Sequence, residues 1–227
     1  MNRLRGKKLR KLSRFNRLWI ASAILCAITT DVQAQTETMP CDTPRFLLHL
    51  STGAKAVRRQ ANALIYGQPM RVYEGQPLEW SHYVVTPLPC ETGGEPEFHN
   101  GDDVVAGVFN GSEPDDTVAD LVPAQCSTPI YLLGLNTVKD SDQYRIYAEA
   151  LRDSRIAPRH GFVRIFGRTP DPVLKGVWPD NTTATLSIWP CVEAFDTMYH
   201  SDWYQNDILP LRKNAARYRL MIFEPAP

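Results

Sequence analysis

The chain has 227 residues, of which 43% are hydrophobic and 22% are charged, with 25 lysines and arginines against 25 aspartates and glutamates. This composition excludes an intrinsically disordered, collagen-like or coiled-coil protein. The length suffices for one large or two small domains, and no motif in the chain identifies a reaction.

The first 34 residues have the three-part pattern of a secretory signal peptide. Residues 1–18 carry eight bases and no acid, an apolar run extends from Leu18 to Ile28, and the small-residue pattern Val32-Gln33-Ala34 follows. A membrane-spanning helix needs about 20 apolar residues, so we expect cleavage near Ala34, with a retained anchor as the alternative. The expected destination is the periplasm of a Gram-negative cell, or secretion.

Without this leader the chain is acidic. Removal of residues 1–34 takes away eight bases and one acid, which leaves 17 bases, 24 acids and a net charge of −7. A negative charge argues against nucleic acid or an anionic membrane surface as the main partner. No later segment is long and apolar enough to span a bilayer, so we do not expect an integral membrane protein.

Three segments of the chain occur twice, in the same order. The first pair, CDTPRFLLHLST and CSTPIYLLGLNT, is identical at seven of twelve positions. The matching pairs are 41–52 with 126–137, 70–77 with 163–170, and 85–90 with 186–191. Collinear matches of this kind predict a tandem duplication, with loop insertions in the second copy.

Copy one begins with an apolar run at Phe46–Leu50, which predicts a buried strand. A helix is expected next, because apolar residues recur at helical spacing. Its stripe is Ala54, Val57, Ala61, Leu64 and Ile65. Further strands are expected at Arg71-Val72-Tyr73, through Tyr83 and Val85, and at Val104–Phe109.

Residues 91–120 connect the copies and carry nine acids, five glycines and no base. Such a composition predicts mostly solvated loop. The acids lack the ligand spacing of an EF-hand, so no metal site is expected there.

Copy two repeats the order of elements. Its first strand is expected at Ile130–Leu135, and its closing strand at Tyr218–Phe223. The helix has the stripe Tyr144, Tyr147, Ala148 and Leu151, with Asp140 or Ser141 as the cap. Between them, strands are expected at Arg164-Ile165-Phe166 and through Ala184, Leu186 and Ile188.

These elements predict an α+β protein of two tandem pseudo-repeats, residues 35–124 and 125–227. Each repeat would fold in the order β-α-β-β-β, as a small antiparallel or mixed sheet covered by one helix, in a ferredoxin-like manner. We expect each repeat to enclose a core of its own.

Four cysteines follow the leader, and an even count in an exported chain favours disulfides. We predict the bridges Cys41–Cys90 and Cys126–Cys191, because this pairing closes each repeat by itself. The rival pairing joins Cys41 to Cys126 and Cys90 to Cys191.

Aromatic residues interleaved with hydrogen-bonding side chains near the C-terminus form one candidate binding surface. They are Trp178, Trp189, Tyr199, Trp203 and Tyr204. Such a surface can stack on sugar rings or anchor a protein partner. Burial in the core is the alternative, since tryptophan is usually largely buried.

Arg71 and Arg164 occupy matching positions in the two copies and are further candidates. An arginine on a predicted strand binds an anionic ligand or pairs with an internal carboxylate. His160 and His200 complete the set of candidate site residues.

No nucleophile, phosphate-binding or metal motif is found, so we predict no catalytic residue, metal or cofactor. We expect a non-enzymatic binding or adaptor protein of the cell envelope, whose partner is an envelope protein or peptidoglycan or another glycan. One alternative is a periplasmic hydrolase with a site between the lobes, around His160, His200 and Asp202. Another is an inhibitor or immunity protein against a secreted toxin.

Overall fold

The strands of the computed structural model form two five-stranded antiparallel sheets, A and B, in an α+β fold. The structure describes residues 43–53, 62–75, 80–89, 104–111, 126–154 and 160–227. All of these residues belong to one compact unit, Thr38–Pro227.

Sheet A has the strand order β2-β4-β1-β5-β8. Its strands are β1 (Arg45–Ser51), β2 (Ile65–Gly67), β4 (His82–Leu88), β5 (Val104–Asn110) and β8 (Val173–Lys175). The central strand β1 pairs with β4 and β5 along its whole length, and Leu48 lies opposite both Val85 and Gly107. The apolar run in β1 therefore forms the buried strand that the sequence predicts.

Sheet B has the order β3-β10-β6-β9-β7. Its strands are β3 (Arg71–Glu74), β6 (Ile130–Val138), β7 (Val163–Arg168), β9 (Thr182–Trp189) and β10 (Ala216–Phe223). Leu133 of β6 lies opposite Met221 of β10 and Leu186 of β9. All the strands expected from the sequence are present, and β2 and β8 are additional.

Each sheet includes one strand from the other half of the chain. β3 lies between β2 and β4 in sequence but pairs with β10 in sheet B. β8 lies between β7 and β9 in sequence but pairs with β5 in sheet A. The sequence match between residues 70–77 and 163–170 therefore aligns β3 with β7, which occupy opposite edges of one sheet. The two halves are joined by exchanged strands as well as by their connecting segment.

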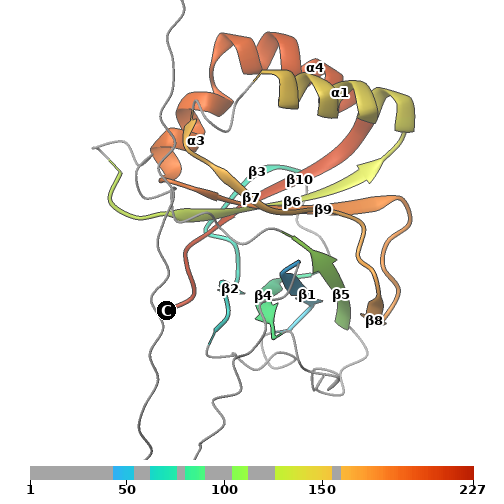
Figure 1. The fold of residues 1–227 in the computed structure, drawn as a ribbon. Coiled ribbons are helices and arrows are strands. Elements are labelled where there is room, and N and C mark those ends of the chain that lie inside the picture. The colour runs from blue at the N-terminus through green and yellow to red at the C-terminus, as the bar shows by residue number, and fades with distance from the viewer. Residues whose placement is uncertain (1–42, 54–61, 76–79, 90–103, 112–125, 155–159) are drawn as a thin grey trace, which may run out of the picture. The chain divides into compact units, whose positions relative to one another are not determined.

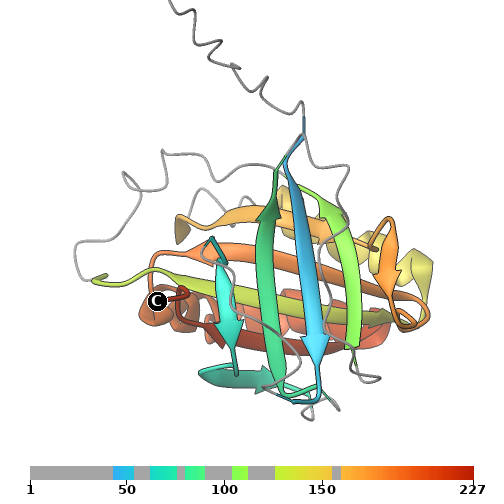
Figure 2. The same cartoon turned by 90° about the horizontal axis from the view of Figure 1, so that it is seen from below.

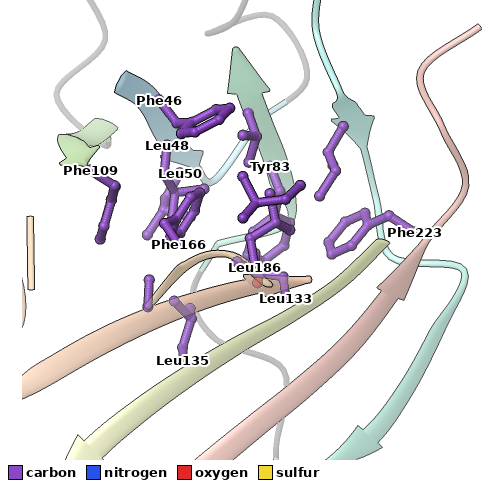
Figure 3. Packing of buried hydrophobic residues seen from close by; sticks show 14 of the residues in the cluster. Phe46, Leu48, Leu50, Tyr83, Phe109, Leu133, Leu135, Phe166, Leu186 and Phe223 are labelled. Atoms are coloured by element: carbon purple, nitrogen blue, oxygen red, sulfur yellow. The ribbon is translucent and has the colours of Figure 1, made fainter. Parts of the chain in front are cut away.

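The sheets pack face to face, with the helices on the far side of sheet B (Figure 1). The strands of sheet A run across those of sheet B (Figure 2). Figure 3 shows side chains of both sheets meeting between them, such as Leu48 and Phe109 from sheet A with Leu133 and Phe166 from sheet B. The expectation that each repeat encloses a core of its own is therefore wrong, because one cluster of buried residues draws on both sheets.

The face of sheet B that points away from sheet A is covered by helical segments (Figure 1). They are α1 (Ser141–Asp153), α3 (Val192–Tyr199), a π-helical turn η3 (Tyr204–Ile208) and α4 (Leu209–Ala215). The predicted helix α1 is confirmed, and the Asp140 carboxylate caps it by accepting from the N–H groups of Asp142 and Gln143. The prediction of a single covering helix is wrong for this sheet, because α3, η3 and α4 also pack there.

The predicted bridge Cys126–Cys191 is present, with an S–S distance of 2.03 Å. It links the segment just before β6 to Cys191, the N-cap residue of α3. The other predicted bridge, Cys41–Cys90, lies outside the described residues, as does the leader.

Most of the predicted helix of copy one also lies outside the described residues. Its last apolar residue, Ile65, is described and belongs to β2, so its assignment to a helix is wrong. Among the described residues, no helix is long and apolar enough to cross a membrane.

Candidate binding site

Strand β3 brings polar side chains of the first half against the helices of the second half. The Met70 N–H donates to the Ile222 carbonyl at 2.8 Å, which holds the start of β3 against β10. The pairing then shifts by one residue at Leu220 and Met221, as in a β-bulge. Bulges commonly redirect side chains, and here both Tyr73 and Glu74 contact residues of α3.

In the outer part of this contact, the ion pair between Arg71 and Asp196 is hydrogen-bonded to the Tyr73 phenol. The Arg71 guanidinium donates to the Tyr73 hydroxyl at 2.8 Å and lies 3.1 Å from the Asp196 carboxylate. The Tyr73 hydroxyl in turn donates to Asp196. The side chains of Arg71 and Asp196 are 51% and 33% exposed, so this part of the site is open to solvent.

The inner part is a second ion pair, which is largely buried. The Glu74 carboxylate pairs with the guanidinium of Arg212 on α4 and accepts a hydrogen bond from the Tyr199 hydroxyl. Arg212 also donates to the Tyr204 hydroxyl, and its guanidinium lies over the Tyr218 ring at 4.6 Å. The Arg212 side chain is only 2% exposed, so a carboxylate partner is needed to compensate its charge.

Aromatic rings pack around both ion pairs. The Tyr73 ring stands edge-on to Phe195 at 4.7 Å and to Tyr199 at 5.3 Å between centroids. Phe195 in turn contacts the buried Trp189 at 5.1 Å. We call Arg71, Tyr73, Glu74, Asp196 and Tyr199 the β3–α3 cluster.

The phenols of this region stay protonated at neutral pH. Burial, followed by the hydrogen bond to Asp196, raises the pKa of Tyr73 to about 12. Burial also raises the pKa of Tyr199 and places that of Tyr204 well above its usual value. Burial lowers the pKa of Arg212 to about 10, which still leaves the guanidinium charged at neutral pH. The tyrosines therefore act as hydrogen-bonding groups, and a phenolate base is not available at neutral pH.

The predicted aromatic surface is mostly turned inward. Trp189 and Tyr204 are buried, and Trp203 is half-buried against the helical layer. Trp178 is half-buried against the core between the sheets and donates to the Thr182 carbonyl at 2.8 Å. Of the five aromatic residues proposed from the sequence, Tyr199 alone joins the β3–α3 cluster, while the Tyr204 ring lies 5.4 Å from that of Tyr199 between centroids.

The two arginines that match between the copies are not brought together. Arg71 is on β3 and Arg164 on β7, at opposite edges of sheet B. Arg71 forms its ion pair with Asp196. Burial raises the pKa of Tyr147 on α1, and the nearby charge of Arg164 opposes that rise.

The two histidines proposed from the sequence contact different rings. His160 lies beside Trp189 at 6.4 Å, and the exposed His200 stands edge-on to Tyr199 at 5.2 Å. Asp202 is exposed beyond the end of α3. Among the described residues, no group of three acids, histidines or cysteines could hold a metal ion.

Four residues of this region are missed by the sequence analysis: Tyr73, Glu74, Asp196 and Arg212. The sequence does carry a signal for the helix that contains Asp196, because Val192, Phe195 and Tyr199 recur at helical spacing on one side of α3. No local signal could pair Glu74 with Arg212, because they lie in different halves of the chain.

Residues 129–226 match the model of a family described as a domain of unknown function, DUF1330. The matched segment runs from β6 to the residues after β10 and includes Asp196, Tyr199 and Arg212, whereas β3 lies outside it. No curated protein and no solved structure matches the chain. The chain is thus similar to this family over its second half, and its candidate site combines that half with a strand from the first.

Proposed function

We propose that the chain is an exported, non-enzymatic binding or adaptor protein of the cell envelope, with peptidoglycan or another glycan as its partner. A basic leader followed by an apolar run supports export. The disulfide Cys126–Cys191 is compatible with an oxidising compartment such as the periplasm.

The β3–α3 cluster is the observation that carries the binding role. It presents a guanidinium, a carboxylate and a tyrosine ring on one partly exposed surface. Surfaces that combine aromatic rings with a few oriented polar groups are typical of binding sites.

We further infer that the two halves arose by tandem duplication and share a ferredoxin-like order of strands. In sheet A the order β2-β4-β1-β5 is followed by a strand of the second half, and in sheet B β7-β9-β6-β10 is followed by a strand of the first. These orders pair β1 with β6, β4 with β9, β5 with β10 and β2 with β7, and this correspondence supports the duplication. The match of residues 70–77 with 163–170 does not follow it, because that match aligns β3 with β7. An experimental structure in which β1, β4 and β5 do not superpose on β6, β9 and β10 would contradict it.

Cosedimentation with purified peptidoglycan sacculi tests the proposed function. The mature protein should pellet with sacculi, and Asp196→Asn should weaken this binding. Arg145→Gln is the matched control, because Arg145 forms an exposed ion pair with Glu149 on α1, away from the cluster. Absence of the wild-type protein from the sacculus pellet would exclude a peptidoglycan partner, and capture of an envelope protein instead would favour the adaptor role.

A further inference from the structure

We propose that the β7 edge of sheet B binds the C-terminal end of a peptide. In this site Arg164 binds the terminal carboxylate, and the Thr185 hydroxyl oxygen accepts a hydrogen bond from the amide N–H of the last peptide residue. The site lies at the opposite edge of the sheet from the β3–α3 cluster and does not use its residues.

Arg164 carries a guanidinium that no carboxylate of the described chain compensates. It matches Arg71 in the sequence repeat, but Arg71 lies 3.1 Å from the Asp196 carboxylate. Among the residues that the structure describes, the exposed Arg164 has neither an ion pair nor a hydrogen bond. A guanidinium can bind a carboxylate through two parallel hydrogen bonds. A ligand can therefore supply this carboxylate without breaking a pair within the protein.

The side chains of Arg164 and Thr185 meet over a glycine. Gly167 of β7 lies opposite Thr185 of β9. The Cδ and Nε atoms of Arg164 lie 3.3 Å and 3.7 Å from the position that a Cβ atom would take at Gly167. The Thr185 methyl group lies 3.4 Å from the same position, so both side chains are on one face of the sheet.

Hydrogen-bond acceptors gather on the other side of Thr185, over Gly134 of β6. The Thr185 Oγ1 atom lies 2.6 Å from the position of a Cβ atom at Gly134, and the Asn136 Oδ1 atom lies 3.5 Å from it. The Thr185 hydroxyl donates to the Gly134 carbonyl at 3.4 Å, so its lone pairs remain free to accept. Asn136 is 1% exposed, and its Oδ1 atom has no hydrogen-bond partner within the described part of the chain. These oxygens favour a ligand that presents an N–H donor here.

The distance between the two ends of the site fits the last residue of a peptide. Gly134 and Gly167 flank Thr185 on the two neighbouring strands, which places them about 10 Å apart. Hydrogen bonds of about 3 Å at each end leave about 4 Å between the donor and the carboxylate of the ligand. In a C-terminal residue only the Cα atom separates the amide nitrogen from the carboxylate carbon. One guanidinium also matches the single negative charge of such an end.

N-acetylalanine has one amide N–H and one carboxylate, and it tests this proposal by NMR titration of the isotope-labelled mature protein. We expect saturable shifts of the backbone amides of Gly167 and Thr185, with an affinity in the millimolar range. N-acetylalanine amide, in which a neutral carboxamide replaces the carboxylate, should bind about tenfold more weakly or less. The two enantiomers distinguish the source of the peptide: preference for the L form favours a protein C-terminus, and preference for the D form favours a peptidoglycan stem peptide.

Two variants test the assigned contacts. Arg164→Gln should weaken the binding of N-acetylalanine by about tenfold or more, and Thr185→Val, which keeps the shape but removes the acceptor, by about threefold or more. Arg168→Gln is the matched control and should leave the affinity unchanged. Arg168 is also exposed on β7, but it lies opposite Ala184, which points into the core between the sheets, so it is on the other face.

Thermal unfolding identifies any variant that fails to fold, and the comparison of the acid with its amide needs only the unmodified protein. Three results would overturn the proposal: no saturable binding of either enantiomer, equal binding of the acid and the amide, or equal losses of affinity in Arg164→Gln and Arg168→Gln.

Discussion

Arg212 is the most deeply buried charged side chain of the described residues, and a residue from the other half of the chain compensates it. Its residue exposure is 1%, its ring neighbours are Tyr204 and Tyr218, and its carboxylate partner is Glu74. Breaking a buried pair by removing one partner is expensive, because the remaining charge keeps its desolvation penalty. The pair therefore fastens β3 to the helical layer.

Glu74→Gln should lower the free energy of unfolding by about 3 kcal/mol, because it leaves the Arg212 charge uncompensated in the protein interior. Chemical denaturation followed by circular dichroism measures the change. Glu149→Gln, at an exposed ion pair with Arg145, is the matched control and should cost no more than about 0.5 kcal/mol. Equal losses of unfolding free energy in the two variants would show that the buried pair stabilises the protein no more than the exposed pair does.

His49 makes the stability depend on pH. Burial, and secondarily the charge of Lys175, lowers the pKa of His49 to about 4 from its ordinary value of 6.5. The unfolded chain then binds a proton below pH 6.5 that the folded chain does not take up until about pH 4. Stability from this residue is present above pH 6.5 and is lost as the pH falls.

We expect His49 to account for a loss of about 3 kcal/mol between pH 7 and pH 4. Urea unfolding across this range measures the slope, and His49→Gln should flatten it. Val177→Ala supplies the control, because this valine is 82% exposed and has no titrating group, and it should leave the slope unchanged. A wild-type stability independent of pH in this range would contradict the assignment to His49.

At the scale of elements, the sheets meet at one corner where backbone approaches backbone. Gly111, just after β5, forms an isolated bridge with Phe166 of β7. A Cβ atom at Gly111 would lie 2.2 Å from the Ile165 carbonyl oxygen, a backbone atom that cannot move aside cheaply. The corner therefore requires a residue without a side chain.

Gly111→Ala should destabilise the protein by at least about 2 kcal/mol through this overlap. Gly53→Ala is the control, because a Cβ atom there has no neighbour within 4 Å. Thermal unfolding of both variants measures the difference in their stability. A Gly111→Ala protein as stable as Gly53→Ala would mean that β5 and β7 do not approach each other in this way.

At the scale of the whole molecule, the shared core predicts one cooperative unfolding transition. The Phe166 ring of sheet B stacks on Phe109 of sheet A at 4.6 Å and contacts Phe46 at 5.9 Å. Strand exchange through β3 and β8 adds further connections between the sheets. Neither sheet is expected to unfold while the other remains intact.

Phe166→Ala should cost about 3–5 kcal/mol and shift the whole transition, as large-to-small changes in a shared core do. Calorimetry with fluorescence and circular dichroism checks that the probes coincide. Val177→Ala, at a valine that is 82% exposed, should change little. Two separate transitions, of which Phe166→Ala moves only one, would instead indicate independent lobes.

The sequence by itself determined most of the strands and the helix α1 of the described chain. The apolar runs of β1 and β6 are read from consecutive residues, and the spacing of Tyr144, Tyr147 and Leu151 with an Asp140 cap is read within one helix. The even number of cysteines pointed to disulfides, and the expected closure of each repeat by itself pointed to the Cys126–Cys191 bridge. The strand and helix signals lie within short segments, and the cysteine count needs only the composition, so neither depends on the fold.

Only the tertiary structure decided which surfaces share a core and which residues form the site. The strand RVYE pairs with β10 rather than with its neighbour in sequence, because edge strands are chosen by long-range packing and not by their own apolar pattern. That choice places Glu74 beside Arg212 and Tyr73 beside Asp196. Polar contacts between distant segments have no periodicity, and for this reason the tryptophans stood out in the sequence while the β3–α3 cluster did not.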